Sequence, residues 1–191
     1  MKIKMVALGK TSRILGLIAA MAAILTGGPF GSALATDAAI IDAEADAALE
    51  RLYQEEGGRE FAEKAKGLLI MPGVGKGALI VGIEHGKGAL RIGGKTVDYY
   101  SMSAGSVGLQ VGGEAKDIII AFLTTEAMEQ FRDSKNWEVG LDGNIAVITA
   151  GAGGTLSNIS DEEPIQAVVF DVKGLFFDMS LKGGKFSKLD L

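Results

Sequence analysis

Residues 76–93 read KGALIVGIEHGKGALRIG, and this stretch decides the fold prediction because it contains one strand pattern twice. Lys76-Gly-Ala-Leu-Ile-Val-Gly82 recurs 11 residues later as Lys87-Gly-Ala-Leu-Arg-Ile-Gly93. Two similar apolar runs joined through the polar residues Glu84-His85-Gly86 are typical of a β-hairpin. One repeat is too short to form a solenoid, so we expect the hairpin to belong to a larger sheet.

Further strands are predicted on both sides of this hairpin. Short apolar runs bounded by turn residues occur at 68–71, 96–102, 106–112, 117–123, 137–141, 145–149, 166–172, 175–181 and 185–189. The run at 117–123 (DIIIAFL) lacks polar alternation, so we expect that strand to be covered on both faces. Residues 151–163 are rich in glycine and polar residues, which indicates a loop.

Three segments have the periodicity of a helix. Residues 37–53 place an apolar stripe on one side and acidic residues on another, namely Ile41, Ala45, Ala48, Leu49 and Leu52 against Asp42, Asp46 and Glu50. Residues 59–66 and 124–134 form shorter helical patterns, and Thr124 can cap the second of them. We therefore predict an α+β fold: an antiparallel β-sandwich or barrel-like sheet of about eight to ten strands, with two N-terminal helices and one inserted helix.

The first 35 residues have the pattern of a cleavable export signal. Four basic residues and no acidic residue precede or flank an apolar stretch from Ile14 to Leu25, which is too short to cross a hydrocarbon core. The small residues Ala33 and Ala35 then predict cleavage before Thr36 on the general secretory route. We expect a periplasmic protein in three parts, with a signal peptide at 1–35, an acidic helix at 36–58 and a folded domain at 59–191.

The charge is strongly uneven along the chain. The whole chain carries −5 and its first 35 residues carry +4, which leaves −9 on residues 36–191. This acidity argues against a nucleic-acid partner, because such binding depends on neutralising phosphates. Residues 59–95 nevertheless hold a net +4, and the absence of cysteine removes disulfides and thiolate chemistry.

Residues suited to catalysis are few. His85 is the single histidine, and a hydrolase would need it beside a nucleophile such as Ser103 or Ser106 and a carboxylate. The segment around Ser106 does not have the spacing of a nucleophile elbow. The glycines around Lys76 do not match a phosphate-binding loop, and one histidine without cysteine does not form a zinc site. We therefore predict no catalytic residue, no metal and no cofactor, and treat a small hydrolase as an alternative.

The basic stretch is the stronger lead. We predict that its cationic side chains gather at one edge of the sheet and bind lipid: Lys64, Lys66, Lys76, Lys87, Arg91 and Lys95. Each basic residue close to an anionic membrane contributes on the order of 1 kcal/mol, so a few would give weak and salt-sensitive attachment.

The order of motifs resembles the SYLF family over about residues 59–190. The resemblance is carried by AKGLLIMP (65–72), the two KGAL strands, YSM (100–102), GSVGLQVGG (105–113), WEVGLDGN (137–144) and the closing GLF…LKGGK (174–185). It is similar above all to the exported bacterial branch of that family.

The resemblance implies a lipid-binding domain without known enzymatic activity. Eukaryotic relatives bind phosphoinositides and some bind actin filaments, and their lipid contact is attributed to basic positions and an amphipathic N-terminal helix. The first helix of this chain is acidic on its polar side, so we place the contact on the second helix and the hairpin. The expected partner is phospholipid or a membrane surface, with peripheral attachment. A protein-interaction module with a partner in the cell envelope is the alternative.

Overall fold

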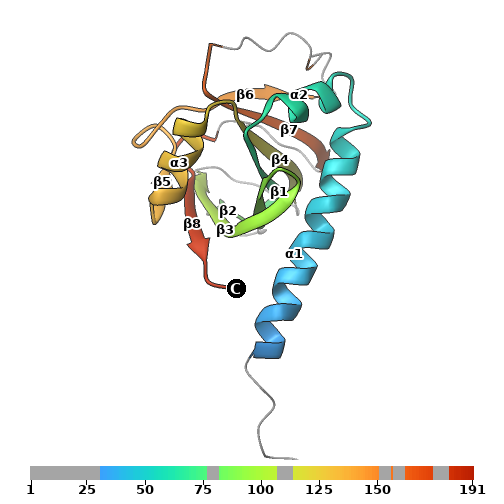
Figure 1. Cartoon of the computed structure of the whole chain (residues 1–191), viewed down its shortest axis with the longest axis vertical. Helices are drawn as coiled ribbons and strands as arrows, with labels where there is room; N and C mark the ends of the chain where they lie inside the picture. Colours follow the sequence, from blue (N-terminus) through green and yellow to red (C-terminus); the bar gives the residue numbers. More distant parts are fainter. Residues whose placement is uncertain (1–30, 77–81, 107–113, 151–155, 157–161, 174–180) are drawn as a thin grey trace, which may run out of the picture. The chain divides into compact units, whose positions relative to one another are not determined.

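The computed structural model describes residues 31–76, 82–106, 114–150, 156, 162–173 and 181–191 (Figure 1). The chain divides into two compact units, Met1–Ala33 and Leu34–Leu191, and the second contains all the described elements apart from the first residues of one helix. The strands predicted at 106–112 and 175–181, and the loop predicted at 151–163, lie almost wholly outside the described residues.

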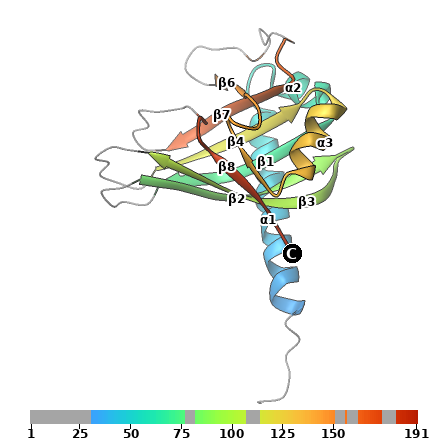
Figure 2. The same ribbon diagram turned by 90° about the vertical axis from the view of Figure 1, so that its left-hand side faces the viewer.

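Eight strands form one curled sheet in the described part of the chain, so the barrel-like alternative is confirmed (Figures 1 and 2). The strands are β1 (Gly67–Lys76), β2 (Gly82–Ile92), β3 (Lys95–Ser106), β4 (Glu114–Phe122), β5 (Asn136–Glu138), β6 (Ala146–Thr149), β7 (Ile165–Lys173) and β8 (Lys185–Leu189). Their order across the sheet is β5-β8-β3-β2-β1-β4-β7-β6.

The sheet is mixed, which corrects the prediction of a purely antiparallel one. Strands β6 and β7 pair in parallel, with Ala146 opposite Gln166 and Thr149 opposite Val169. Parallel neighbours need a long connection that returns the chain to the same end of the sheet. Residues 150–164 provide that connection between the two strands.

The predicted turn at residues 84–86 is wrong, because these residues lie inside strand β2. Glu84 pairs with Ala104 of β3 and with Lys76 of β1, so it belongs to the ladder on both sides. The turn prediction failed because Glu84, although charged, is buried against a partner from another strand. Glu84 is 4% exposed and lies 3.2 Å from the ammonium group of Lys116, a partner 32 residues away that local patterns do not reveal.

The concave face of the sheet forms one of two hydrophobic cores, here called the inner core. Helix α3 (Thr125–Asp133) covers it, and Thr124 caps the helix by accepting a 3.2 Å hydrogen bond from the Ala127 N–H, as predicted. Phe131 of α3 lies at its centre, with ring centroids 4.8 Å from Tyr100 and 5.5 Å from Trp137. Aromatic packing between α3 and four strands therefore fills the interior.

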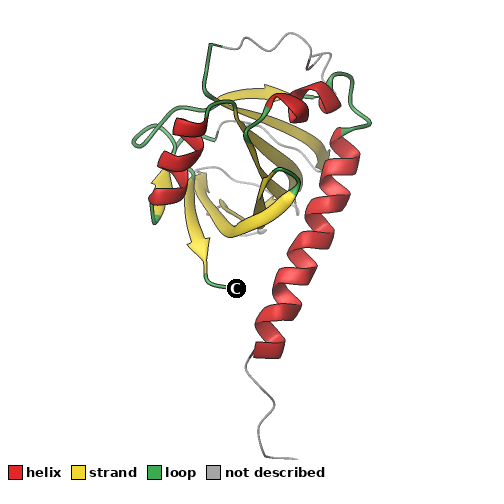
Figure 3. Ribbon diagram, viewed as in Figure 1, coloured by secondary structure: helices red, strands yellow, loops and turns green. Residues whose placement is uncertain are grey.

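The convex face forms the outer core beneath helices α1 (Gly31–Leu52) and α2 (Gly58–Lys64), drawn red in Figure 3. The predicted apolar stripe of α1 is buried there, with Ala45, Ala48 and Leu52 all fully covered. Strand β4 has one core on each side, because Ile118 and Ile120 point to the inner core and Ile119 points to the outer one. The prediction that this strand is covered on both faces is confirmed.

A bulge interrupts β1 at Pro72-Gly73. Met71 pairs with Ile118 and Val74 pairs with Lys116, so β1 contains one more residue than β4 at this point. The proline has no N–H, and the N–H of Gly73 donates to the Asp117 carboxylate at 2.9 Å. The bulge thereby leaves no backbone donor unsatisfied and brings Asp117 into contact with β1.

Candidate functional site

The predicted basic residues lie on four different elements. Lys64 ends α2, Lys66 lies between α2 and β1, Lys87 and Arg91 lie on β2, and Lys95 begins β3. Lys76 ends β1, and its side chain lies outside the described residues. Lys87 and Arg91 point to the outer face of the sheet, where α1 crosses it.

The acidic side of α1 pairs with the basic side of β2. Arg91 forms an ion pair with Asp46, and the Lys87 ammonium lies 3.9 Å from the Asp37 carboxylate. The spacings match: the nine residues from Asp37 to Asp46 along the helix and the four residues from Lys87 to Arg91 along the strand both cover about 13 Å. The acidic face of the first helix is thus a docking surface within the protein, and matching these spacings could have revealed it from the sequence.

Asp42 is the main anchor of α1. Its carboxylate accepts hydrogen bonds from the Thr96 hydroxyl at 2.6 Å and from the Tyr99 hydroxyl at 2.9 Å. Its backbone carbonyl accepts a further bond from Arg91 at 3.2 Å. Burial raises the pKa of Tyr99 above its ordinary value, and the bond to the Asp42 carboxylate raises it further. Tyr99 therefore remains a neutral donor throughout the physiological pH range.

Two of the predicted residues, Lys66 and Arg91, line one pocket of about 340 Å³. We call it the corner pocket, because it lies where the end of α1, α2, the start of β1 and the β2–β3 turn meet. Its other lining residues are mainly apolar or glycine: Leu49, Tyr53, Ala62, Glu63, Ala65, Gly67, Leu68, Gly93 and Gly94. Lys95 does not line the pocket: it pairs with Ile92, which packs against the inner core, so Lys95 lies on the face of the sheet opposite Arg91.

The charges of the corner are only partly neutralised. The Arg91 side chain is 12% exposed, and its Nε atom is buried without a hydrogen-bond partner in the described part of the chain. Neither Lys66 nor Lys95 has a carboxylate within ion-pair distance among the described residues. Lys64 lies outside the pocket and contacts Glu60 on its own helix at 3.6 Å. Cations beside an apolar wall suit a ligand with an anionic head and a hydrophobic neighbour.

Residues 103–190 match the family model described as Ysc84: Las17-binding protein actin regulator. Residues 103–190 are therefore assigned to the Ysc84, or SYLF, family. The match extends from the end of β3 to β8, so the predicted family is confirmed over that segment, while the exported bacterial branch stays a prediction. No curated protein matches the chain at a significant level.

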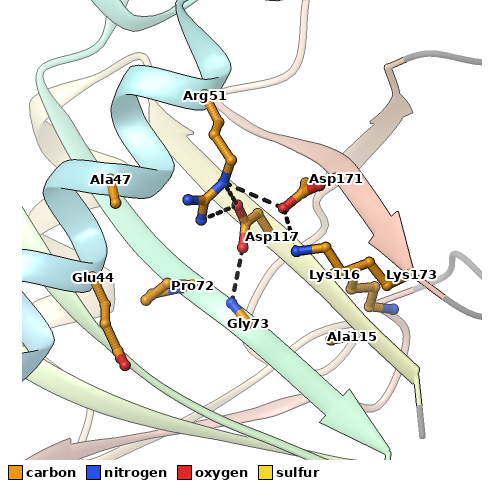
Figure 4. Close-up of a pocket in the computed structure, with 10 residues that line it drawn as sticks. All are labelled: Glu44, Ala47, Arg51, Pro72, Gly73, Ala115, Lys116, Asp117, Asp171 and Lys173. Carbon is orange, nitrogen blue, oxygen red and sulfur yellow. Dashed lines mark hydrogen bonds and ion pairs between the residues drawn. The ribbon is translucent and has the colours of Figure 1, made fainter.

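A second cleft, shown in Figure 4, lies beside the bulge of β1. Arg51 of α1 contacts Asp117 of β4 at 2.6 Å and Asp171 of β7 at 3.3 Å, and Lys173 contacts Asp171 at 3.1 Å. Asp171 adopts a φ of 48°, a conformation unfavourable for a residue with a side chain. Lys116, which also lines the cleft, pairs with Glu84. All three cations of the cleft are therefore paired, and the Arg51 network functions as a clasp that joins α1 to two strands.

The residues considered for hydrolysis are only partly brought together. His85 and Ser103 are exposed and lie opposite each other on β2 and β3, whereas the side chain of Ser106 lies outside the described residues. Within the described ranges, no hydrogen bond joins His85 to Ser103 and no carboxylate pairs with His85. The described part likewise contains no group of three or more residues placed to hold a metal ion.

None of the described helices is both long enough and apolar enough to cross a membrane.

Proposed function

We propose that this SYLF domain is a non-enzymatic, periplasmic lipid-binding module that attaches peripherally to anionic membrane surfaces through the corner pocket. One observation carries the proposal. Lys66 and Arg91 line the same pocket as the apolar side chains of Leu49 and Leu68. A phospholipid offers the complementary pair, an anionic phosphate joined to an apolar chain.

The predicted attachment is weak and salt-sensitive. Lys66 is exposed and contributes on the order of 1 kcal/mol near an anionic surface. Arg91 contributes less because Asp46 already contacts it. Raising the salt concentration shortens the range of these attractions, so binding weakens.

Export is supported by the place where α1 begins to pack. The buried residues of this helix start at Ile41, downstream of the predicted cleavage before Thr36. Cleavage would therefore remove no described side chain of the outer core. N-terminal sequencing of the protein recovered from the periplasmic fraction tests this part of the proposal, with Thr36 as the expected first residue.

A liposome flotation experiment tests the proposed surface. The K66E variant reverses one charge at the corner, and K135E makes the same change at another exposed position. We expect the corner variant to bind vesicles with 30% anionic lipid roughly fivefold more weakly at low salt, as one lost contact of ~1 kcal/mol predicts. The other variant should bind like the unaltered protein. Equal losses in both variants would contradict a localised site, and no flotation of the unaltered protein at low salt would end the proposal.

A protein partner in the cell envelope is the second candidate, favoured by the family description, which names a Las17-binding protein. It predicts that the corner variant floats with vesicles like the unaltered protein but loses a cross-linked envelope protein.

A further inference from the structure

The two edge strands of the sheet, β5 and β6, are joined by residues 139–145, which carry the chain across the opening between the edges. A pocket of about 280 Å³ lies there, bounded by this segment, by β6 and by the residues before β8. We call it the seam pocket. Its volume lies just below the range of about 300–1,000 Å³ typical of small-molecule sites.

The apolar wall of the seam pocket is continuous with the inner core. Val139 and Leu181 are buried members of that core, and Ile145 and Val147 pack against it. An aliphatic ligand in the pocket would therefore contact core side chains and extend the apolar interior. The polar lining includes Lys182, which is exposed, and Asn144. A carboxylate or phosphate at the mouth would find a cation beside an amide.

A rigid turn presents an apolar side chain next to this pocket. Leu141 is 79% exposed, the most exposed large apolar residue of the described part. Its turn is fixed by the 2.7 Å bond from the Gly140 N–H to the Gly143 carbonyl and by the 2.7 Å bond from the Glu138 N–H to the Asp142 carboxylate. Because these two hydrogen bonds fix the turn, Leu141 is held in its exposed position.

We propose that the seam pocket binds one unbranched aliphatic chain of a lipid, with its acidic head beside Lys182 and Leu141 against the chain where it leaves the pocket. This inference rests on the proposed lipid-binding function and assigns it a second site, distinct from the corner pocket. At roughly 30 Å³ for each water-sized group, the pocket holds about nine such groups, which suits one medium-length chain.

The single tryptophan provides the readout. Trp137 belongs to the inner core, and its ring lies under the same turn, 2.7 Å from where a Cβ on Gly143 would be. Titration of the full chain with monomeric decanoate, followed by tryptophan fluorescence, is expected to saturate at one ligand per chain. Monomeric dihexanoyl phosphatidylglycerol, titrated in parallel, distinguishes a phospholipid source of the chain from a free fatty acid.

Variants locate the binding. V147F fills the pocket and is expected to weaken decanoate binding at least tenfold, while V147T, which keeps the size but adds a hydroxyl, weakens it several-fold if V147F does not fold. K182Q should weaken decanoate but leave decanol unchanged, and K135Q, with the same loss of charge elsewhere, should alter neither. The inference is overturned if decanoate does not saturate, or if the Val147 variant that folds binds it normally. K66E separates the two sites, since it should weaken flotation roughly fivefold and leave the decanoate titration intact.

Discussion

Asp46 contacts Arg91, one of the two predicted cations that line the corner pocket. Its side chain is 66% exposed, so it can be neutralised without loss of packing. We expect D46N to bind anionic vesicles about two- to fivefold more tightly at low salt, because an exposed ion pair of at most ~1 kcal/mol no longer competes. E50Q, which removes one charge from an exposed position of the same helix, is the control for flotation. Equal gains in the two variants would indicate a general charge effect instead of competition at Arg91.

Asp98 makes the fold sensitive to acid. Burial alone would raise its pKa, but hydrogen bonds from Lys188 and Arg132 outweigh burial and hold the pKa below its ordinary value of 3.8. A lowered pKa stabilises the folded state above the ordinary value, and this contribution is lost as the pH falls through the folded-state pKa. The two cations are 41% and 35% exposed, which limits the contribution to about 1 kcal/mol.

D98N should therefore unfold about 1 kcal/mol more easily than the unaltered protein at pH 7. The difference should shrink as the pH falls from the ordinary pKa of 3.8 through the lowered folded-state pKa, because the carboxylate of the unaltered protein then becomes neutral too. Urea unfolding at several pH values measures it. A difference that does not shrink in acid would contradict the assigned role.

The sequence was sufficient to select the cations but not to assign their contacts. Arg91 was predicted from the net charge of residues 59–95, whereas its partner Asp46 lies 45 residues away on a helix whose acidic face is typical of solvent exposure. Lys66 and Arg91 meet only because α2 leads into β1 beside the β2–β3 turn. Charge patterning describes one element at a time, and such contacts depend on how the elements pack.

At the scale of elements, Gly88 is required where β2 passes β1. A Cβ at this position would lie 2.1 Å from the Ile70 carbonyl oxygen, which belongs to the backbone and cannot rotate away. We expect G88A to lower the free energy of unfolding by at least about 3 kcal/mol. G105A on β3 is the matched control, because a Cβ there meets nothing within 4 Å and should change stability by less than about 0.5 kcal/mol. Similar unfolding midpoints for the two variants would contradict the prediction, because β1 and β2 would then accommodate a Cβ at position 88 at little free-energy cost.

The helices and most described strands were predictable because their periodicity is local. Thr124 and the apolar stripe of α1 each depend on residues within a few turns of each other. The continuation of β2 through residues 84–86 was not predictable in this way, since Glu84 is buried by pairing with Lys116. The parallel pairing of β6 was also missed, because strand direction depends on the return path of the chain and not on composition.

For the whole molecule, the structure explains how a basic segment exists in a strongly acidic protein. The acidic helix lies over the outer face and pairs with Lys87 and Arg91, so much of the local charge is balanced internally. Of the predicted cations that line the corner pocket, Lys66 remains exposed. Such a small cationic surface favours reversible attachment over permanent anchoring.

The bulge in β1 also constrains how this chain can change over time. Leu69 and Met71 point inward at odd positions, and Val74 points inward at an even one, because Pro72 and Gly73 together face a single residue of β4. Losing one residue here would invert every later side chain of the strand, whereas replacing a residue would not. In descendants that keep this architecture, we expect alignment gaps to be absent from the segment and substitutions to be tolerated except at Gly73, whose φ of 55° favours glycine.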